Sequence, residues 1–340
     1  MKLCYIVQVH SKLDQVLWLM NFLNLDENFL ILNVDNEKLF VHFKKLFEDY
    51  SNIKVRRSIP VAYCGFSQVL AWVDVFRSAI ESFDFDFVIN LSETDIVLRG
   101  DNEIKQILAE QYKRNKRIFM NAWKVKKEIN PLMLNSFSVK NPIKPRIASL
   151  FNSRGTTIEI DPELEDLFSD VKKSPILNVP LRLSLWCEER YGQKYIYVRP
   201  LLKYEARIRE FFIKKFPIFC GRVWFIFHYD ALSYILTKIE ELSDFVYFFS
   251  SIFEPDEEFF STLILNDKKL IDTVSFNNFR IKGGAPLRIT DEMYEDIVHD
   301  SINLFGRKLD FENSHRIRNY LEEKILKKFL LQTTLNIVRK

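Results

Sequence analysis

A regular alternation of apolar runs and helix-patterned segments over residues 3–98 constrains the fold more than any other feature. Apolar runs rich in β-forming residues, the pattern of buried strands, occupy residues 3–9, 29–34, 53–55 and 87–91. Apolar residues at helical spacing occupy residues 12–25, 37–47 and 67–83. Strands that alternate with helices form right-handed βαβ units. The sequence therefore predicts an α/β fold, with a mostly parallel sheet flanked by helices and a Rossmann-like nucleotide-binding half.

The rest of the chain divides at a proline-rich stretch between residues 130 and 180, which predicts an irregular insertion facing the substrate. A strand at 223–227, a helix at 230–242 and a C-terminal helix at 314–328 follow it. We expect one domain over residues 1–310. Its parts are residues 1–125, the insertion at 126–215 and residues 216–310, and a C-terminal helix and tail (311–340) follows.

Composition excludes several classes of protein. The 340 residues are 47% hydrophobic, which suits a globular core. With 49 basic and 46 acidic residues, the net charge is only +3, so no nucleic-acid partner is expected. Neither a signal-peptide pattern nor about 18 consecutive apolar residues occurs. The four cysteines (Cys4, Cys64, Cys187 and Cys220) show no C-x-x-C spacing. We therefore expect a reducing, cytoplasmic location, or a peripheral one on the inner face of a membrane.

Polar residues follow three of the predicted strands, at the point where each strand ends. They are His10 and Ser11, then Asp35 and Asn36, then residues 92–95. Parallel α/β sheets bind ligands at the carboxyl ends of their strands, so these residues predict a nucleotide pocket. Neither a G-x-G-x-x-G motif nor a G-x-x-x-x-G-K-[ST] motif is present, and neither a dinucleotide fingerprint nor a P-loop is supported.

The segment Asp84-Phe85-Asp86 resembles the D-x-D motif with which many sugar-nucleotide enzymes hold a divalent metal. Both aspartates precede the predicted strand at 87–91, however, so they should lie at its entry end, away from the pocket. We interpret them as solvated turn residues. The carboxylate at the exit end of the strand is Asp95, and its simpler interpretation is a turn or helix N-cap residue.

Four segments in this order resemble the family of core-2/I-branching β-1,6-N-acetylglucosaminyltransferases and protein xylosyltransferases. They are VHSKLDQVLWLMNFLNLDENFLILNVD (9–35), GFSQVLAWVDVFRSAIESFDFDFVINLSETDIVL (65–98), GRVWFIFHYDALSYIL with FFSSIFEPDEEFFSTLILN (within 221–266), and FRIKGGAPLRITDEMYEDIVHDSINLFGRKLD (279–310). The resemblance spans most of residues 5–310, and the region 130–210 diverges. Residues 93–95 read ETD where the family has G-x-D, and residues 225–230 read FIFHYD where it has FxLSRE.

The resemblance implies a GT-A-type sheet and an inverting sugar transfer from a nucleoside-diphosphate sugar without a D-x-D metal site. It also implies that the catalytic domain has a nucleotide-binding half (1–125), an acceptor-side insertion (126–215) and an acceptor and catalytic half (216–310). Glu257 matches the family's P-D-E glutamate, which would make it the catalytic base that deprotonates the acceptor hydroxyl. The neighbouring Asp256 would support that loop or contact the acceptor. An ordinary explanation for both is that acidic residues are favoured in the first turn of a helix that starts at Pro255.

Without a metal, fixed cations must neutralise the leaving diphosphate. Lys308 and Arg280 match the family's lysine and upstream arginine, and are the predicted diphosphate-binding residues. Arg288 and Arg307 are close alternatives. For any one basic residue, solvation at the surface is the simpler explanation.

The predicted nucleotide- and donor-binding residues are His10, Asp35, Ser67 and Asp95. His10 could equally be a structural histidine at a strand end. Trp224 is a candidate for lining the acceptor site, because aromatic faces pack on sugars, although a tryptophan in a strand also suits the core.

We therefore predict a metal-independent inverting glycosyltransferase without a cofactor, which moves N-acetylglucosamine or xylose from a UDP-sugar to a glycan hydroxyl in surface polysaccharide synthesis. A metal-dependent transferase that uses Glu93 or Asp95 as ligands, and a non-catalytic module that binds a sugar nucleotide or glycan, remain alternatives. The apolar, basic C-terminus ILKKFLLQTTLNIVRK would either dock on the core or contact an anionic membrane, where lipid-linked acceptors reside.

Overall fold

The structure is a computed structural model, which describes residues 1–59, 61, 66–124, 185–188, 193–196, 217–242, 245–246, 249, 255–282 and 288–326. Residues of the predicted insertion and tail that fall outside these ranges are not described here.

A seven-stranded sheet organises the described residues, in the order β12-β6-β11-β4-β1-β2-β3. The four strands predicted from the sequence are β1 (Leu3–Val9), β2 (Phe29–Val34), β3 (Ile53–Arg57) and β4 (Phe87–Ser92), and they are mutually parallel. The later strands are β6 (Ile118–Phe119), β11 (Ile226–His228) and β12 (Val274–Ser275). Strand β11 runs antiparallel to both of its neighbours. The predicted α/β class with a mostly parallel central sheet is confirmed.

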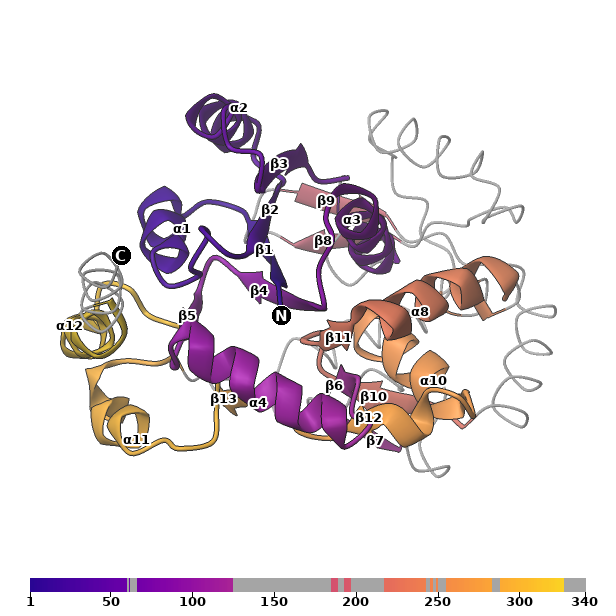
Figure 1. Ribbon diagram of the computed structural model, residues 1–340. Coiled ribbons are helices and arrows are strands. Elements are labelled where there is room, and N and C mark those ends of the chain that lie inside the picture. The colour runs from indigo at the N-terminus through magenta and orange to yellow at the C-terminus, as the bar shows by residue number, and fades with distance from the viewer. Residues whose placement is uncertain are drawn as a thin grey trace.

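Helices cover both faces of this sheet (Figure 1). One face carries α3 (Ser67–Ser82), α8 (Tyr229–Glu241) and α10 (Phe259–Asn266). The other carries α1 (Leu13–Met20), α2 (Glu37–Leu46), α4 (Asp101–Lys113), α11 (Tyr294–Val298) and α12 (His315–Leu321). Alternation along β1 supplies both cores, because Cys4 and Ile6 face the first set of helices while Tyr5 and Val7 face the second.

Three predicted elements differ in their bounds. The first helix ends at Met20, although Phe22 and Leu23 beyond it are still buried, so the apolar spacing outlasts the helix. The predicted strand at 223–227 begins only at Ile226, because side-chain hydrogen bonds hold the preceding residues. The predicted C-terminal helix is α12 followed by a π-helical turn, Glu322–Leu326, and its last two residues lie outside the described ranges.

A second, three-stranded sheet was not predicted from the sequence. It joins β13 (Arg280–Lys282), β14 (Phe305–Arg307) and β5 (Asp95–Val97), in that order. Strand β13 is parallel to β14 and β14 is antiparallel to β5, so Arg280 pairs with Phe305 and Arg307 pairs with Asp95. This register brings residues of the first and last thirds of the chain to one place.

Smaller elements complete the described structure. Two antiparallel pairs are β7 (Ala122–Lys124) with β10 (Phe219–Gly221), and β8 (Leu185–Glu188) with β9 (Gln193–Ile196). Short 3-10 helices span Pro255–Glu257, Ile271–Thr273 and Asp291–Met293. The C-terminal helix is docked on α1, where the indole Nε1 of Trp18 donates to Glu322 Oε1 at 2.7 Å. In the described part of the chain, no helix combines the length and the apolar character that crossing a bilayer requires.

Candidate active site

The loop that follows β1 is fastened to the end of β4 by one buried carboxylate. Glu93 Oε2 accepts the backbone N–H groups of His10, Ser11 and Lys12 at 2.8, 3.0 and 3.1 Å. Its other oxygen accepts the Ser11 hydroxyl at 3.3 Å. Four donors therefore satisfy the Glu93 carboxylate, which shapes the edge of the sheet.

His10 and Asp35 meet at the same edge, from the ends of β1 and β2. The His10 Nδ1 atom is hydrogen-bonded to Asp35 Oδ2. This hydrogen bond raises the pKa of His10 above its ordinary value, against the opposing effect of partial burial. The predicted convergence of the three polar groups at the carboxyl ends of the strands is thus confirmed.

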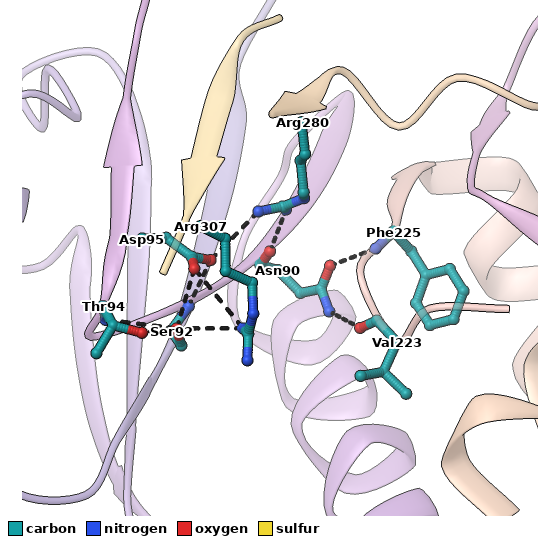
Figure 2. Close-up of polar contacts among 8 residues, drawn as sticks. All are labelled: Asn90, Ser92, Thr94, Asp95, Val223, Phe225, Arg280 and Arg307. Atoms are coloured by element: carbon teal, nitrogen blue, oxygen red, sulfur yellow. Dashed lines mark hydrogen bonds and ion pairs between the residues drawn. The ribbon is translucent and has the colours of Figure 1, made fainter. Parts of the chain in front are cut away.

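Asp95 lies at the centre of a buried ionic network (Figure 2). Its Oδ2 atom accepts the Ser92 N–H at 3.0 Å and is 3.2 Å from Arg280 Nη1. Its Oδ1 atom accepts the Ser92 hydroxyl at 3.1 Å and is 3.6 Å from Arg307 Nη1. One carboxylate is therefore shared by two guanidinium groups, which leaves the cluster with a net positive charge.

Arg280 is the more deeply buried of the two arginines. Its Nη2 atom donates to the backbone oxygen of Asn90 at 2.5 Å. Burial lowers the pKa of Arg280 to about 10, partly offset by the attraction of Asp95. A pKa of that size still keeps the guanidinium charged at neutral pH.

Arg307 lies flat against an aromatic ring. Its guanidinium carbon is 3.6 Å from the centre of the Trp224 ring, and the Arg280 guanidinium is 5.2 Å from the same ring. Burial is the main cause that lowers the pKa of Arg307, and Asp95 opposes it. Trp224 is itself buried and meets Trp72 edge to face, so it contacts cations and core at once.

Asn90 links this network to the loop that carries Trp224 (Figure 2). Its amide nitrogen donates to the Val223 oxygen at 2.6 Å, and its amide oxygen accepts the Phe225 N–H at 2.6 Å. The side chain of Asn90 thus holds the residues on both sides of Trp224. An asparagine within an apolar strand is the sequence signal that could have pointed to this role, because a buried amide needs partners.

Lys308 follows Arg307 directly and reaches solvent. Partial burial, then the neighbouring charges of Arg307 and Arg288, lower the pKa of Lys308 from its ordinary value. Asp95 and Glu93 oppose this lowering of the Lys308 pKa. Lys308, Arg307 and Arg280 therefore form a group of cations beside the exit edge of the sheet.

The predicted base lies on the exit side of the sheet as well. Glu257 is exposed at the end of a 3-10 helix, and Asp256 before it is buried. Phe259, two residues further on, packs edge to face on Phe66 at 5.7 Å between ring centres. Phe66 is the N-cap residue of α3, whose first residue is the buried Ser67. A helix that follows a parallel strand begins at the strand's exit end. The start of α3, and Glu257 near it, therefore lie on that side of the sheet.

Asp84 and Asp86 lie at the opposite end of β4, as predicted. Asp86 Oδ2 accepts the backbone N–H of Lys2 at 2.6 Å, and Asp84 Oδ2 is 3.8 Å from Lys2 Nζ. They fasten the start of β1 to the start of β4. Among the described residues, there is no group of three or more His, Cys, Asp or Glu side chains that could hold a metal ion.

Comparison with known proteins relates the first part of the chain to one family. The model of the Core-2/I-Branching enzyme family matches residues 3–154. This match covers somewhat less than half of the chain, and it includes the first two segments that carry the resemblance seen in the sequence. No curated protein matches the sequence.

Solved structures similar to the chain are remote in sequence. Mouse xyloside xylosyltransferase 1 is 8% identical with a TM-score of 0.36, covering 92% of this chain and 99% of that one. A 4-diphosphocytidyl-2C-methyl-D-erythritol synthase from Anaerococcus prevotii is 11% identical with a TM-score of 0.31, covering 70% and 74%. A CMP:2-keto-3-deoxy-manno-octonic acid synthetase, solved with CTP, is 8% identical with a TM-score of 0.28, covering 74% and 87%.

Proposed function

We propose that this protein is an inverting, metal-independent glycosyltransferase, and that it moves N-acetylglucosamine or xylose from a UDP-sugar to a glycan hydroxyl. The observation that carries the proposal is the group of cations at the exit edge of the sheet, formed by Arg280, Arg307 and Lys308. A diphosphate leaving group develops negative charge there as the sugar departs, and preorganised cations stabilise that charge without reorganisation.

In this proposal the three cations have different tasks. Lys308 reaches solvent and binds the diphosphate directly. Arg280 contributes its charge from behind, because its guanidinium is buried against Asp95 and Asn90. Arg307, the alternative weighed from the sequence, lies between them and supplies further hydrogen-bond donors.

Metal independence is supported by the state of the two exit-edge carboxylates. Glu93 already accepts four protein donors, and Asp95 already neutralises part of the charge of two arginines. A divalent cation at Asp95 would be held beside two guanidinium charges, which oppose it. The metal-dependent alternative would need Glu93 or Asp95 to leave these partners.

In the chemical step, the acceptor oxygen attacks the anomeric carbon and the bond from that carbon to the diphosphate oxygen breaks. Glu257 takes the proton of the acceptor hydroxyl, and the diphosphate leaves with the electron pair of the broken bond. Asp256 supports the short helix that carries Glu257. His10, Asp35, Ser67 and Asp95 belong to the donor side.

The first test is calorimetric titration of UDP in EDTA, followed by the same titration with Mn²⁺. We expect binding in EDTA that Mn²⁺ leaves unchanged. Binding that requires Mn²⁺ would support the metal-dependent alternative. An absence of binding in both conditions would reject a UDP-sugar donor.

The second test concerns the base and separates an enzyme from a binding module. Glu257→Gln should reduce turnover of UDP-sugar by about 10²- to 10⁴-fold and leave UDP affinity nearly unchanged, because a base acts only on the acceptor proton. Glu110→Gln, at an exposed glutamate of α4, serves as the control. Turnover by Glu257→Gln at the wild-type rate would remove Glu257 from the mechanism.

We propose that the acceptor is a lipid-linked glycan of surface polysaccharide synthesis. The protein would meet this acceptor at the cytoplasmic face of the membrane. The basic segment 327–340, which lies outside the described residues, would supply the peripheral membrane contact.

A further inference from the structure

Trp224 carries an inference that deepens the proposed function and rests on it. Aromatic residues near a sugar site invite the interpretation that their faces bind the acceptor. In this structure, however, only 8% of Trp224 is exposed. The Arg307 guanidinium lies 3.6 Å from the ring centre, and the ring of Trp72 meets Trp224 at an interplanar angle of 80°. Little of the indole remains for a sugar.

The Arg307 guanidinium is restrained in two directions. Trp224 supports its flat face, and Asp95 with the Ser92 hydroxyl holds its edge through Nη1, at 3.6 and 3.3 Å. Among the described residues, Nη1 makes all the hydrogen bonds and ion pairs of this side chain, and Nε and Nη2 make none. The Arg307 side chain is 24% exposed, so a ligand can approach it from solvent.

We propose that Trp224 is a positioning residue of the donor site, which holds the Arg307 guanidinium in the plane needed to donate to the diphosphate of a UDP-sugar. A long side chain loses considerable freedom when it binds, and a stacked arginine has lost much of that freedom beforehand. Trp224 is itself fixed, because Asn90 bonds the residues on both sides of it. The effect of Trp224 is therefore on donor binding.

The test measures UDP affinity by calorimetry in EDTA for folded variants, with folding checked by thermal melting. Trp224→Leu should weaken UDP binding by about threefold to thirtyfold, the range of a cation–π contact in partly desolvated surroundings. Trp224→Phe keeps an aromatic face and should recover most of the affinity. In an Arg307→Met background, Trp224→Leu should have almost no further effect, because the group it positions is gone.

The chain offers a matched control elsewhere. The Arg316 guanidinium lies over the Tyr294 ring at the same 3.6 Å, between α11 and α12. Tyr294→Leu removes an equivalent stack and should leave UDP affinity unchanged. A loss of affinity in this control would mean that the Trp224 effect is a general one on stability.

Several results would overturn the proposal. Unchanged UDP affinity in folded Trp224→Leu would mean that Trp224 serves the acceptor side or the core and does not position Arg307. An equal loss of UDP affinity with and without Arg307 would show that the two residues act separately. If Trp224→Leu does not fold, Arg307→Lys decides, because lysine keeps the charge but loses the flat, stacked group. Full UDP affinity in that variant would reject positioning. If the wild-type protein itself fails to bind UDP, the proposed function fails instead.

Discussion

Two pairs of carboxylates flank strand β4, one before it and one after it, and each has a single residue between its members. Asp84 and Asp86 at the entry end have side chains that are 99% and 48% exposed. Glu93 and Asp95 at the exit end are 5% and 0% exposed. The entry pair contacts the chain terminus, whereas the exit pair organises backbone amides and two arginines. Spacing alone does not distinguish them, and position relative to the strand does.

The largest difference between the two pairs should be in stability. Asp95→Asn leaves Arg280 buried without its counter-ion, and removing one partner of a buried ion pair costs about 3–5 kcal/mol of the free energy of unfolding. Asp86→Asn should cost under about 1 kcal/mol, as is usual for exposed ion pairs. Denaturant unfolding of both variants measures the difference. Equal losses would remove the contrast between the two ends of β4.

The next difference should be in ligand binding. Lys308→Ala removes the most accessible cation at the exit end and should weaken UDP binding by about tenfold to a hundredfold, the value of a charge-assisted hydrogen bond. Lys2→Ala removes a lysine at the entry end, beside Asp84, and should leave UDP affinity as it is. Calorimetry in EDTA compares them. Weaker UDP binding by Lys2→Ala would mean that UDP binds at the entry end of the sheet, against the proposal.

The smallest effect concerns protonation at the exit end. Because Asp35 raises the pKa of His10, the charged pair stabilises the fold below pH 6.5, the ordinary value, and this contribution is lost as pH rises through the raised pKa. Asp35→Asn should lower the pKa of His10, measured by NMR titration of the imidazole. An unmoved His10 pKa in the variant would show that Asp35 is not the cause.

The parallel half of the fold could be predicted from the sequence because its strands are apolar on both faces and separated by helical spacing. The exit edge could be predicted for the same reason, since polar residues follow directly after β1, β2 and β4. The family resemblance gives Arg280 and Lys308 as candidate residues, but their surroundings could not be predicted. Arg280 lies 185 residues from Asp95, and only the register of the small sheet brings the two together.

The sequence pattern also predicts the wrong hydrogen-bond partners for the backbone of residues 223–225. Residues 223–225 have the composition of a strand, yet the Asn90 amide takes the hydrogen bonds that a neighbouring strand would have made. A single buried side chain can replace part of a β-ladder, and such a replacement has no periodicity in sequence. For this reason the sequence predicts a strand around Trp224 and gives no sign of the ion network beside it.

The antiparallel pairing of β7 with β10 has a consequence for the connection between them. Cys220 lies opposite Trp123, so the chain leaves the core and re-enters it at adjacent positions. Because this strand pair closes the connection between β7 and β10, the length of that connection has little effect on the stability of the core. The entropy of closing a loop grows only slowly with the length of the loop. The number of residues between the two strands can therefore change while the sheet that carries the exit edge keeps its register.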